Sequence, residues 1–228
     1  LALWDRVLVA VDMPFAVLQA GDSPARNGVV VTSPTKASVG DLRTTIRGRL
    51  YGSYWDAFQL ALQGRVFAPT GPKNSYVADG QIYGGGDVLL GGRLPYFVWA
   101  ASTGATAHAS TNPTSVNFSA ALGLVLLDEN FQVGPEFFGR YLVNARNLFE
   151  GQGAEITREG TMNAEGMLTA RYRFLDDFVA AAGGGMGLSN GVGTPRARVL
   201  ASFAWAPRPA SGPGDTDGDG ITDDIDAC

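Results

Sequence analysis

The sequence has little of several residue types that define common protein classes. It holds one cysteine in 228 residues, which excludes a framework of disulfides within the chain. Lysine occurs only as Lys36 and Lys73, and charged residues make up 17% of the chain, below the roughly 25% of an ordinary soluble domain. The net charge of −5 excludes a nucleic-acid-binding protein that acts through bulk positive charge.

Long apolar runs are also missing. The longest stretch without a charged residue, 94–127, is interrupted by Ser, Thr, Asn and Pro, and residues 178–195 contain three consecutive glycines that disfavour a helix. We therefore expect no transmembrane helix. Apolar residues (45%) and glycine (31 residues, about twice the usual share of roughly 7%) are abundant, and the mean hydropathy is +0.03.

The acidity of the chain is concentrated at its C-terminal end. Six of the 22 acids lie within the last fourteen residues, where no base occurs, so the other sixteen nearly balance the seventeen bases. The preceding segment, 208–214, is rich in Pro and Gly, which is typical of a linker. We therefore divide the chain into a body (1–207), a linker (208–214) and a tail (215–228).

Hydrophobic and polar residues alternate with a period of two through most of the body. In residues 41–50, for example, Leu42 and Ile46 fall on one face of an extended chain, and Arg43 and Arg47 on the other. The sequence therefore predicts an all-β antiparallel fold. The ten expected strands are 7–17, 41–50, 57–67, 81–94, 96–106, 117–126, 131–143, 163–174, 178–188 and 198–205.

Short and long connections alternate between these strands. The tight turns are expected near 53–56, 94–96, 127–130 and 175–178, and the longer loops near 21–39, 68–79, 107–115, 144–162 and 189–195. Aromatic residues or leucines flank nearly every short turn, among them Trp55, Tyr96 and Phe178. A belt of this kind is typical of a membrane interface.

The pattern resembles that of outer-membrane β-barrels. The strands are long enough to cross a bilayer, their polar faces carry both signs of charge, and the loop lengths are asymmetric. The resemblance implies an antiparallel transmembrane β-barrel with its polar faces around a hydrated lumen. The alternative is a soluble sandwich, lipocalin-like or lectin-like fold, which would need a helix or a second sheet to cover the apolar faces.

The ends of the body suggest a fragment. Residues 1–5 resemble the end of a strand entering a short turn, so we expect the barrel to be incomplete at its N-terminal side and a signal peptide to be absent or removed. Since single-chain bacterial barrels have even strand numbers, ten visible strands and one further hairpin would make twelve in the complete protein. Residues 199–205 resemble the terminal strand that the outer-membrane assembly machinery recognises, although any closing strand that faces lipid would show this pattern.

Thirteen charged residues are expected to face the lumen of such a barrel. They are Asp12, Asp41, Arg43, Arg47, Arg49, Arg65, Asp87, Arg93, Glu136, Arg140, Arg171, Arg173 and Arg198. Pairing across the lumen would plug it, whereas separation by sign would create a transverse field that favours small polar solutes. The four acids and nine bases of this set disfavour cation selectivity.

The tail has the spacing of a calcium loop. Acids at positions 1, 3, 5, 9 and 12, with a glycine at position 6, would converge on one hard cation that prefers six to eight oxygens. The expected ligands are the carboxylates of Asp215, Asp217, Asp219, Asp223 and Asp226 and the carbonyl of Ile221. The tail also resembles a thrombospondin type-3 repeat, in which Asp226 would serve an adjacent site and Cys228 would pair with a later cysteine. A merely solvated acidic run is the alternative.

The order of barrel, linker and calcium repeat resembles OmpA-like proteins. The resemblance implies the outer membrane of a Gram-negative bacterium, with the tail in the periplasm and attachment to peptidoglycan through a domain that this sequence does not contain. The first hypothesis is therefore structural anchoring of the outer membrane, in contact with its lipid. The second is a channel for small polar solutes, and the third is a soluble calcium-dependent β-sandwich binding protein. No nucleic-acid partner is expected.

The residues that could support catalysis do not form a recognisable site. His108 is the only histidine, and we expect it at the surface near an outer loop. The sequence that begins at Ser189 is similar to the motif of the outer-membrane phospholipase, but Gly187 stands where that motif has its histidine.

Two carboxylates of the body could be imagined as an acid–base pair. For Glu136 and Glu165 we instead expect ion pairs with Arg140 or Arg171 in the lumen. The sequence therefore predicts no enzyme activity.

Overall fold

A computed structural model describes residues 2–3, 6–20, 25–26, 29–30, 34–73, 75, 77–109, 114–143, 162–190 and 194–207. Within these ranges the chain forms strands and turns and contains no helix. The main sheet consists of a two-residue strand, β1 (Ala2–Leu3), and ten longer strands: β2 (Val7–Asp12), β7 (Leu42–Tyr51), β8 (Gln59–Ala68), β9 (Tyr83–Arg93), β10 (Phe97–His108), β11 (Thr114–Leu126), β12 (Phe131–Val143), β13 (Met162–Phe174), β14 (Phe178–Gly187) and β15 (Arg198–Trp205).

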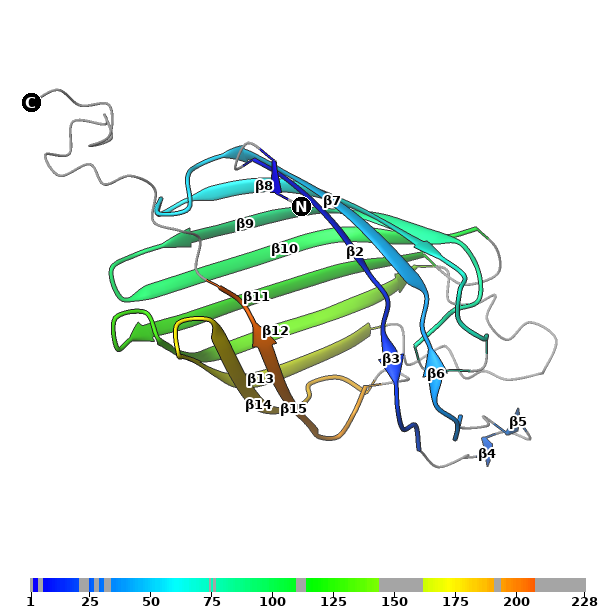
Figure 1. Ribbon diagram of the computed structural model, residues 1–228. Helices are drawn as coiled ribbons and strands as arrows, with labels where there is room; N and C mark the ends of the chain where they lie inside the picture. The colour runs from blue at the N-terminus through cyan, green and yellow to red at the C-terminus, as the bar shows by residue number, and fades with distance from the viewer. Residues whose placement is uncertain are drawn as a thin grey trace, which may run out of the picture.

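The strands follow one another in the sheet in the order of the sequence. The order is β1-β2-β7-β8-β9-β10-β11-β12-β13-β14-β15, and every neighbouring pair is antiparallel (Figure 1). The all-β antiparallel fold and its ten strands are thus confirmed. The short strand β1 pairs with the start of β2, with Ala2 opposite Leu8 and Leu3 opposite Val7.

One predicted strand is broken into two pieces. The expected strand 7–17 ends at Asp12, and Phe15–Ala16 (β3) pairs instead with Ser38–Val39 (β6) in a separate two-stranded sheet. The break falls at Pro14, which has no N–H to donate to a ladder and accepts a hydrogen bond only through its carbonyl, from the Gly40 N–H. Another small pair joins β4 (Ala25–Arg26) and β5 (Val29–Val30).

The short connections lie together at one end of the sheet. The turns 94–96, 127–130 and 175–177 join β9–β10, β11–β12 and β13–β14, and in Figure 1 they gather at the left, opposite the longer connections. The tightest of these turns require a left-handed backbone, since Asp128 and Asp176 have φ of 50° and 59°. Turns of this hand match the right-handed twist of the two strands that they join.

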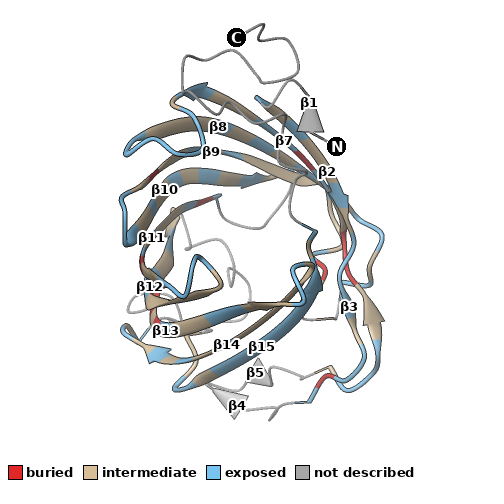
Figure 2. Ribbon diagram, turned by 60° about the vertical axis from the view of Figure 1, so that its left-hand side comes forward, coloured by how far each residue is buried: buried red, intermediate tan, exposed pale blue. Residues whose placement is uncertain are grey.

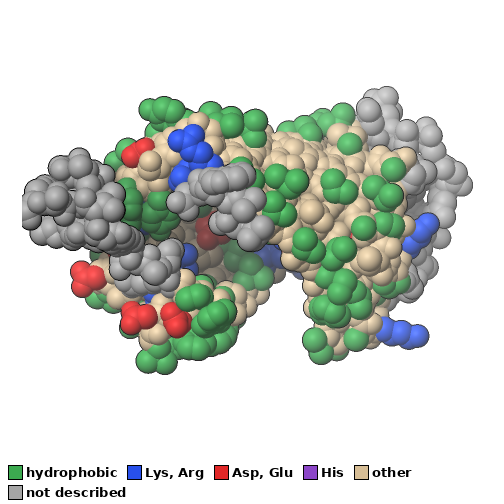
Figure 3. Space-filling model, turned by 45° about the horizontal axis from the view of Figure 1, so that its top comes forward, with side chains coloured by type: hydrophobic (Ala, Val, Ile, Leu, Met, Phe, Trp, Pro, Cys, Tyr) green, Lys and Arg blue, Asp and Glu red, His purple; other side chains and the backbone are tan. Residues whose placement is uncertain are grey.

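The sheet bends round into an open cylinder (Figure 2), and the space-filling view shows a hollow in it (Figure 3). Among the described residues, the register gives no pairing between β15 and β1 or β2, so the two ends of the sheet are not joined. Directly opposed residues of neighbouring strands share a face, so the register assigns each position to one of two faces. We call them the apolar face and the polar face.

The two faces differ sharply in composition. The apolar face carries exposed side chains such as Ile46, Leu122, Leu168 and Phe203, and Figure 3 shows hydrophobic side chains spread over the outside of the cylinder. Charged side chains are visible inside the hollow in the same view. The polar face is therefore the inner, concave one.

A hydrophobic core is almost absent from the described part of the chain. Its buried hydrophobic residues are only Ala78, Ala164 and Met167, and no large side chain is fully buried. Neither a second sheet nor a helix packs on the apolar face within the described ranges. The two-layer core that a soluble sandwich requires is therefore not formed by these residues.

Candidate functional site

The candidate site is the set of charged side chains on the polar face. They form two groups, separated by β10 and β11, which contain no Asp, Glu, Lys or Arg. The first wall, on β2 and β7–β9, consists of Asp12, Arg43, Arg47, Arg49, Arg65, Asp87 and Arg93. The second wall, on β12, β13 and β15, consists of Glu136, Arg140, Glu165, Arg171, Arg173 and Arg198.

The first wall contains two ion pairs between neighbouring strands. Arg43 on β7 binds Asp12 on β2 through two contacts of 2.9 Å. Arg65 on β8 donates to Asp87 on β9 at 2.7 Å, and this pair is the less exposed of the two. Both pairs run along the wall because their strands are adjacent in the sheet.

Glutamine extends the second of these pairs into a small network. Gln63 stands directly opposite both Arg47 and Asp87 in the register. Its amide oxygen accepts from Arg47 Nη2 at 2.7 Å and Nε at 3.0 Å, while its amide nitrogen donates to Asp87 Oδ2 at 3.2 Å. Arg47 is thus held in place by a neutral group and not by a carboxylate.

A glycine on β10 makes room for this network. Gly104 is the residue opposite Asp87, and a Cβ at position 104 would collide with the Asp87 carboxylate. The small residue is therefore required by a close approach rather than by its backbone angles.

The second wall contains an ion pair that reaches over a whole strand. Glu165 on β13 accepts two hydrogen bonds from Arg198 on β15, at 2.5 and 2.9 Å, although β14 lies between them. The residues of β14 that oppose the pair are Gly187 and Gly185. Since neither has a side chain, the guanidinium can lie across β14.

The other polar groups of the second wall pair with neutral partners. Thr169 donates to Glu136 at 2.6 Å, and Arg171 donates to the amide oxygen of Gln132 at 2.9 Å. The sequence-based expectation that Glu136 and Glu165 bind Arg140 or Arg171 was therefore wrong. Glu165 binds Arg198, and Glu136 binds a hydroxyl group.

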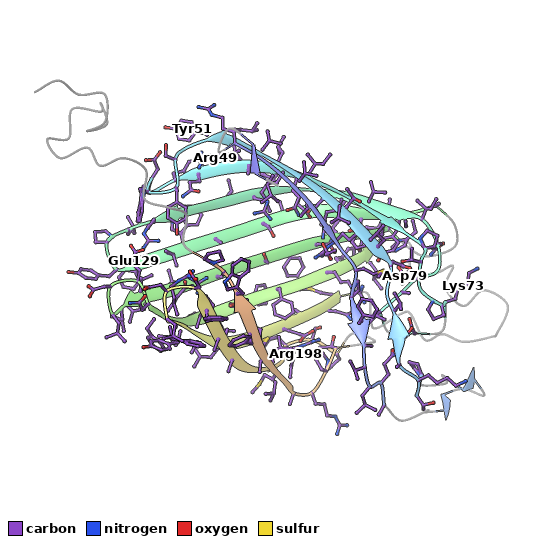
Figure 4. The ribbon with its side chains drawn as sticks, in the orientation of Figure 1. Arg49, Tyr51, Lys73, Asp79, Glu129 and Arg198 are labelled. Atoms are coloured by element: carbon purple, nitrogen blue, oxygen red, sulfur yellow. The ribbon has the colours of Figure 1, made fainter. Side chains whose placement is uncertain are left out.

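Arginines also fix the end of the sheet that carries the short turns. Arg93 forms an ion pair with Glu129 and lies over the ring of Trp55, with 4.8 Å between the guanidinium carbon and the ring centroid. Figure 4 shows Glu129 at this end of the molecule. Arg173 donates to the carbonyl oxygens of Asp176 and Ala206, which joins the 175–177 turn to the segment after β15.

The opposite end is held by two aspartates of the connections. Asp41, buried just before β7, accepts hydrogen bonds from the backbone N–H groups of Gly71 and Asp79, so it anchors the connection between β8 and β9. Asp79, marked in Figure 4, lies 3.0 Å from His108 Nε2. His108 is the last residue of β10, beside the expected loop, and its side chain is 12% exposed, so it is partly covered.

Ser189 also has a structural role. Its hydroxyl group donates to the Met162 carbonyl and accepts from the Ala164 N–H, which fastens the connection after β14 to the start of β13. The hydroxyl group of Ser189 is thus both a donor and an acceptor in hydrogen bonds with the backbone.

The predicted lumen-facing residues other than Asp41 all belong to strands of one of the two walls. Arg43, Arg65, Arg93 and Arg198 form ion pairs there with acidic residues. Glu165 was not among those thirteen residues, although an ion pair in the lumen was expected for it. The partners Gln63, Gln132 and Glu129 were also missed. Their signal is positional, since Gln63 and Gln132 oppose arginines in the register.

The predicted calcium ligands Asp215, Asp217, Asp219, Ile221, Asp223 and Asp226 lie outside the described residues, as do the linker and Cys228. Within the described ranges no group of three or more His, Cys, Asp or Glu residues could hold a metal ion. No helix in this part of the chain has the length and apolarity needed to cross a membrane.

Comparison with known proteins gives no family assignment. No protein-family model matches the chain, and no curated protein matches its sequence. The functional argument therefore depends on the chemistry of the two faces.

Proposed function

We propose that this chain is the membrane-spanning part of an outer-membrane protein, in which the curved sheet closes into a β-barrel around a water-filled passage for small polar solutes. One observation carries the proposal: the hydrophobic face of the sheet points outward and is exposed, while the charged face lines the hollow (Figure 3). In water a large apolar surface of this kind would be exposed to solvent, whereas in a bilayer the acyl chains of the lipid would cover it.

The dimensions of the strands support this proposal. Strands β7 to β14 have 10 to 13 residues, and a tilted strand needs about 9–11 residues to cross the hydrocarbon region. A shallow pocket of about 740 Å³ over β10–β13 is lined mostly by apolar residues, among them Trp99, Leu122, Phe137 and Leu168 of the apolar face. Acyl chains are suitable occupants of such a surface.

Aromatic residues indicate how the sheet would be oriented in the membrane. Tyr54, Trp55, Tyr96 and Trp205 are exposed near the end that carries the short turns. Tyrosine and tryptophan prefer the interface between lipid and water, because one end of the ring system is apolar and the other is polar. In outer-membrane barrels the short turns face the periplasm.

The arrangement of ion pairs favours an open passage over a plug. The pairs Arg43–Asp12 and Arg65–Asp87 join adjacent strands, and Glu165–Arg198 joins strands two places apart. Among the described residues, no ion pair joins the first wall to the second. Salt bridges along the wall leave the centre of the hollow available to water.

Structural anchoring is the second candidate function. The backbone N–H of Ala206 donates to the Asp177 carbonyl at 2.6 Å, so the chain leaves β15 beside a short turn. A tail that starts there would extend into the periplasm, where the acidic loop 215–228 could take up calcium and lead toward peptidoglycan. This function is compatible with a passage through the same barrel.

Two measurements test the proposal. The chain is folded into detergent micelles and run on a gel with and without boiling; a closed barrel should migrate differently before and after heating. The folded protein is then added to planar lipid bilayers, where discrete conductance steps are expected. A chain that shows no heat-dependent shift would refute the membrane barrel. A heat-dependent shift without any conductance would refute the passage and leave anchoring as the function.

A further inference from the structure

The two walls of the hollow carry charge of the same sign. The first wall has five arginines and two aspartates, and the second has four arginines and two glutamates. Figure 2 shows β7–β9 and β13–β15 on opposite sides of the hollow, with the strands β10 and β11 between them. A transverse field between opposite signs, which the sequence left open, is therefore not what the strands create.

We infer that this hollow selects small anions, such as chloride and inorganic phosphate, and passes them between its two basic walls. The inference rests on the proposed passage and adds the class of solute that it carries. Rings and rows of arginine are the means by which pores prefer anions. An anion between the walls would also reduce the repulsion between their positive charges.

The positive charge is available because much of it is not neutralised by carboxylates. Five wall arginines have no carboxylate partner among the described residues: Arg47, Arg49, Arg140, Arg171 and Arg173. On each wall, one of these arginines is bound by a neutral glutamine. A glutamine amide oxygen accepts from Arg47 on the first wall and from Arg171 on the second, at 2.7 and 2.9 Å. A neutral amide orients each guanidinium and leaves its charge to act on the hollow.

Arginine also suits these solutes chemically. Its planar guanidinium stays charged at any physiological pH and offers several N–H groups in a fork that matches an oxyanion. One or two N–H groups of Arg47 and Arg171 are used by glutamine, so others remain for a passing ion. Weak, multiple contacts of this kind allow an ion both to enter and to leave.

The experiment measures the ion selectivity of the 228-residue chain in planar bilayers under a gradient of potassium chloride, and then of potassium phosphate. The test variant combines Arg47→Gln with Arg171→Gln and removes one charge from each wall. The control variant combines Lys36→Gln with Arg196→Gln. It removes the same charge from exposed positions in the connections.

The inference expects a reversal potential with the sign of anion preference in both salts. In the test variant this potential should shift toward zero, and in the control variant it should stay close to that of the unchanged protein. The inference is overturned if the channel conducts but prefers potassium, or if the reversal potential of the test variant shifts no more than that of the control. In both cases the proposed passage stands. A folded barrel that conducts no ions overturns the passage and the inference together.

Discussion

The two ion pairs of the first wall allow a matched test of how burial sets the strength of a contact on the polar face. Asp87→Asn and Asp12→Asn are the same chemical change, and each removes the charge of an aspartate that binds an arginine of an adjacent strand. The side chains of Asp87 and Arg65 are 8% and 20% exposed, whereas those of Asp12 and Arg43 are 44% and 42% exposed. The residue types are thus the same while solvent access differs. The contacts differ as well, because Arg43 makes two contacts with Asp12, whereas Asp87 accepts one hydrogen bond from Arg65 and one from Gln63.

The expected magnitudes follow from that difference. Hydrogen bonds to a charged group in a partly buried site contribute about 1.5–3 kcal/mol, and Asp87 accepts from both Arg65 and Gln63, so Asp87→Asn should lower the free energy of unfolding by about that amount. An exposed ion pair contributes about 0–1 kcal/mol, so Asp12→Asn should cost less than about 1 kcal/mol. Salt should weaken the Asp12 pair more than the Asp87 pair, because solvent screens exposed charges.

The assay is equilibrium unfolding in urea of the protein folded in lipid vesicles, followed by the fluorescence of its four tryptophans. A double-mutant cycle with Arg65→Gln separates the pairwise term from the loss of Gln63. Equal losses for the two aspartate variants, or a coupling energy between Arg65 and Asp87 near zero, would show that burial on the polar face does not strengthen the pair.

Three further changes test other parts of the argument. Gly104→Ala should destabilise the fold by about 1–3 kcal/mol, because its methyl group would overlap the Gly86 carbonyl oxygen and the Asp87 side chain. Gly64→Ala, whose new methyl group would meet nothing within 4 Å, should be close to neutral in the same urea titration. Leu122→Arg on the apolar face should cost about 2–4 kcal/mol near the centre of a bilayer, and Ser119→Arg on the polar face much less; similar costs in vesicles would argue against lipid contact. Asp217→Ala should abolish calcium binding by the tail in isothermal titration calorimetry. Unchanged binding would contradict the prediction that the spaced acids of 215–226 form a calcium site.

The strands could be predicted from the sequence because their signal is local. Each strand alternates with a period of two, and each short connection contains turn residues, so the order and number of strands follow without knowledge of the tertiary structure. The topology of the main sheet adds little to this, because each of its strands pairs with the strand of the same sheet that comes next along the chain. The exception at Pro14 is also local, and a proline inside an expected strand is itself a warning of a break.

The partners of the charged residues could not be predicted in the same way. Alternation assigns Glu165 to a face, but its partner depends on how far β13, β14 and β15 slide along one another, and a slip of one residue would reverse every face. The actual partner, Arg198, lies 33 residues away and on the next strand but one. The contact of Asp79 with His108 likewise depends on the path of a connection, for which the sequence has no periodic signal.

Several glycines of the polar face lie directly beside charged residues. On the polar face, four charged residues have a glycine as a direct cross-strand neighbour: Asp87 opposes Gly104, Arg65 opposes Gly85, Glu165 opposes Gly187 and Arg198 opposes Gly185. Because none of these neighbours has a side chain, each of the four charged side chains can extend past it along the concave wall. A Cβ at Gly85, Gly104 or Gly185 would overlap a backbone carbonyl oxygen of an adjacent strand. Enlarging these glycines should therefore disturb the backbone ladder as well as the ion pairs.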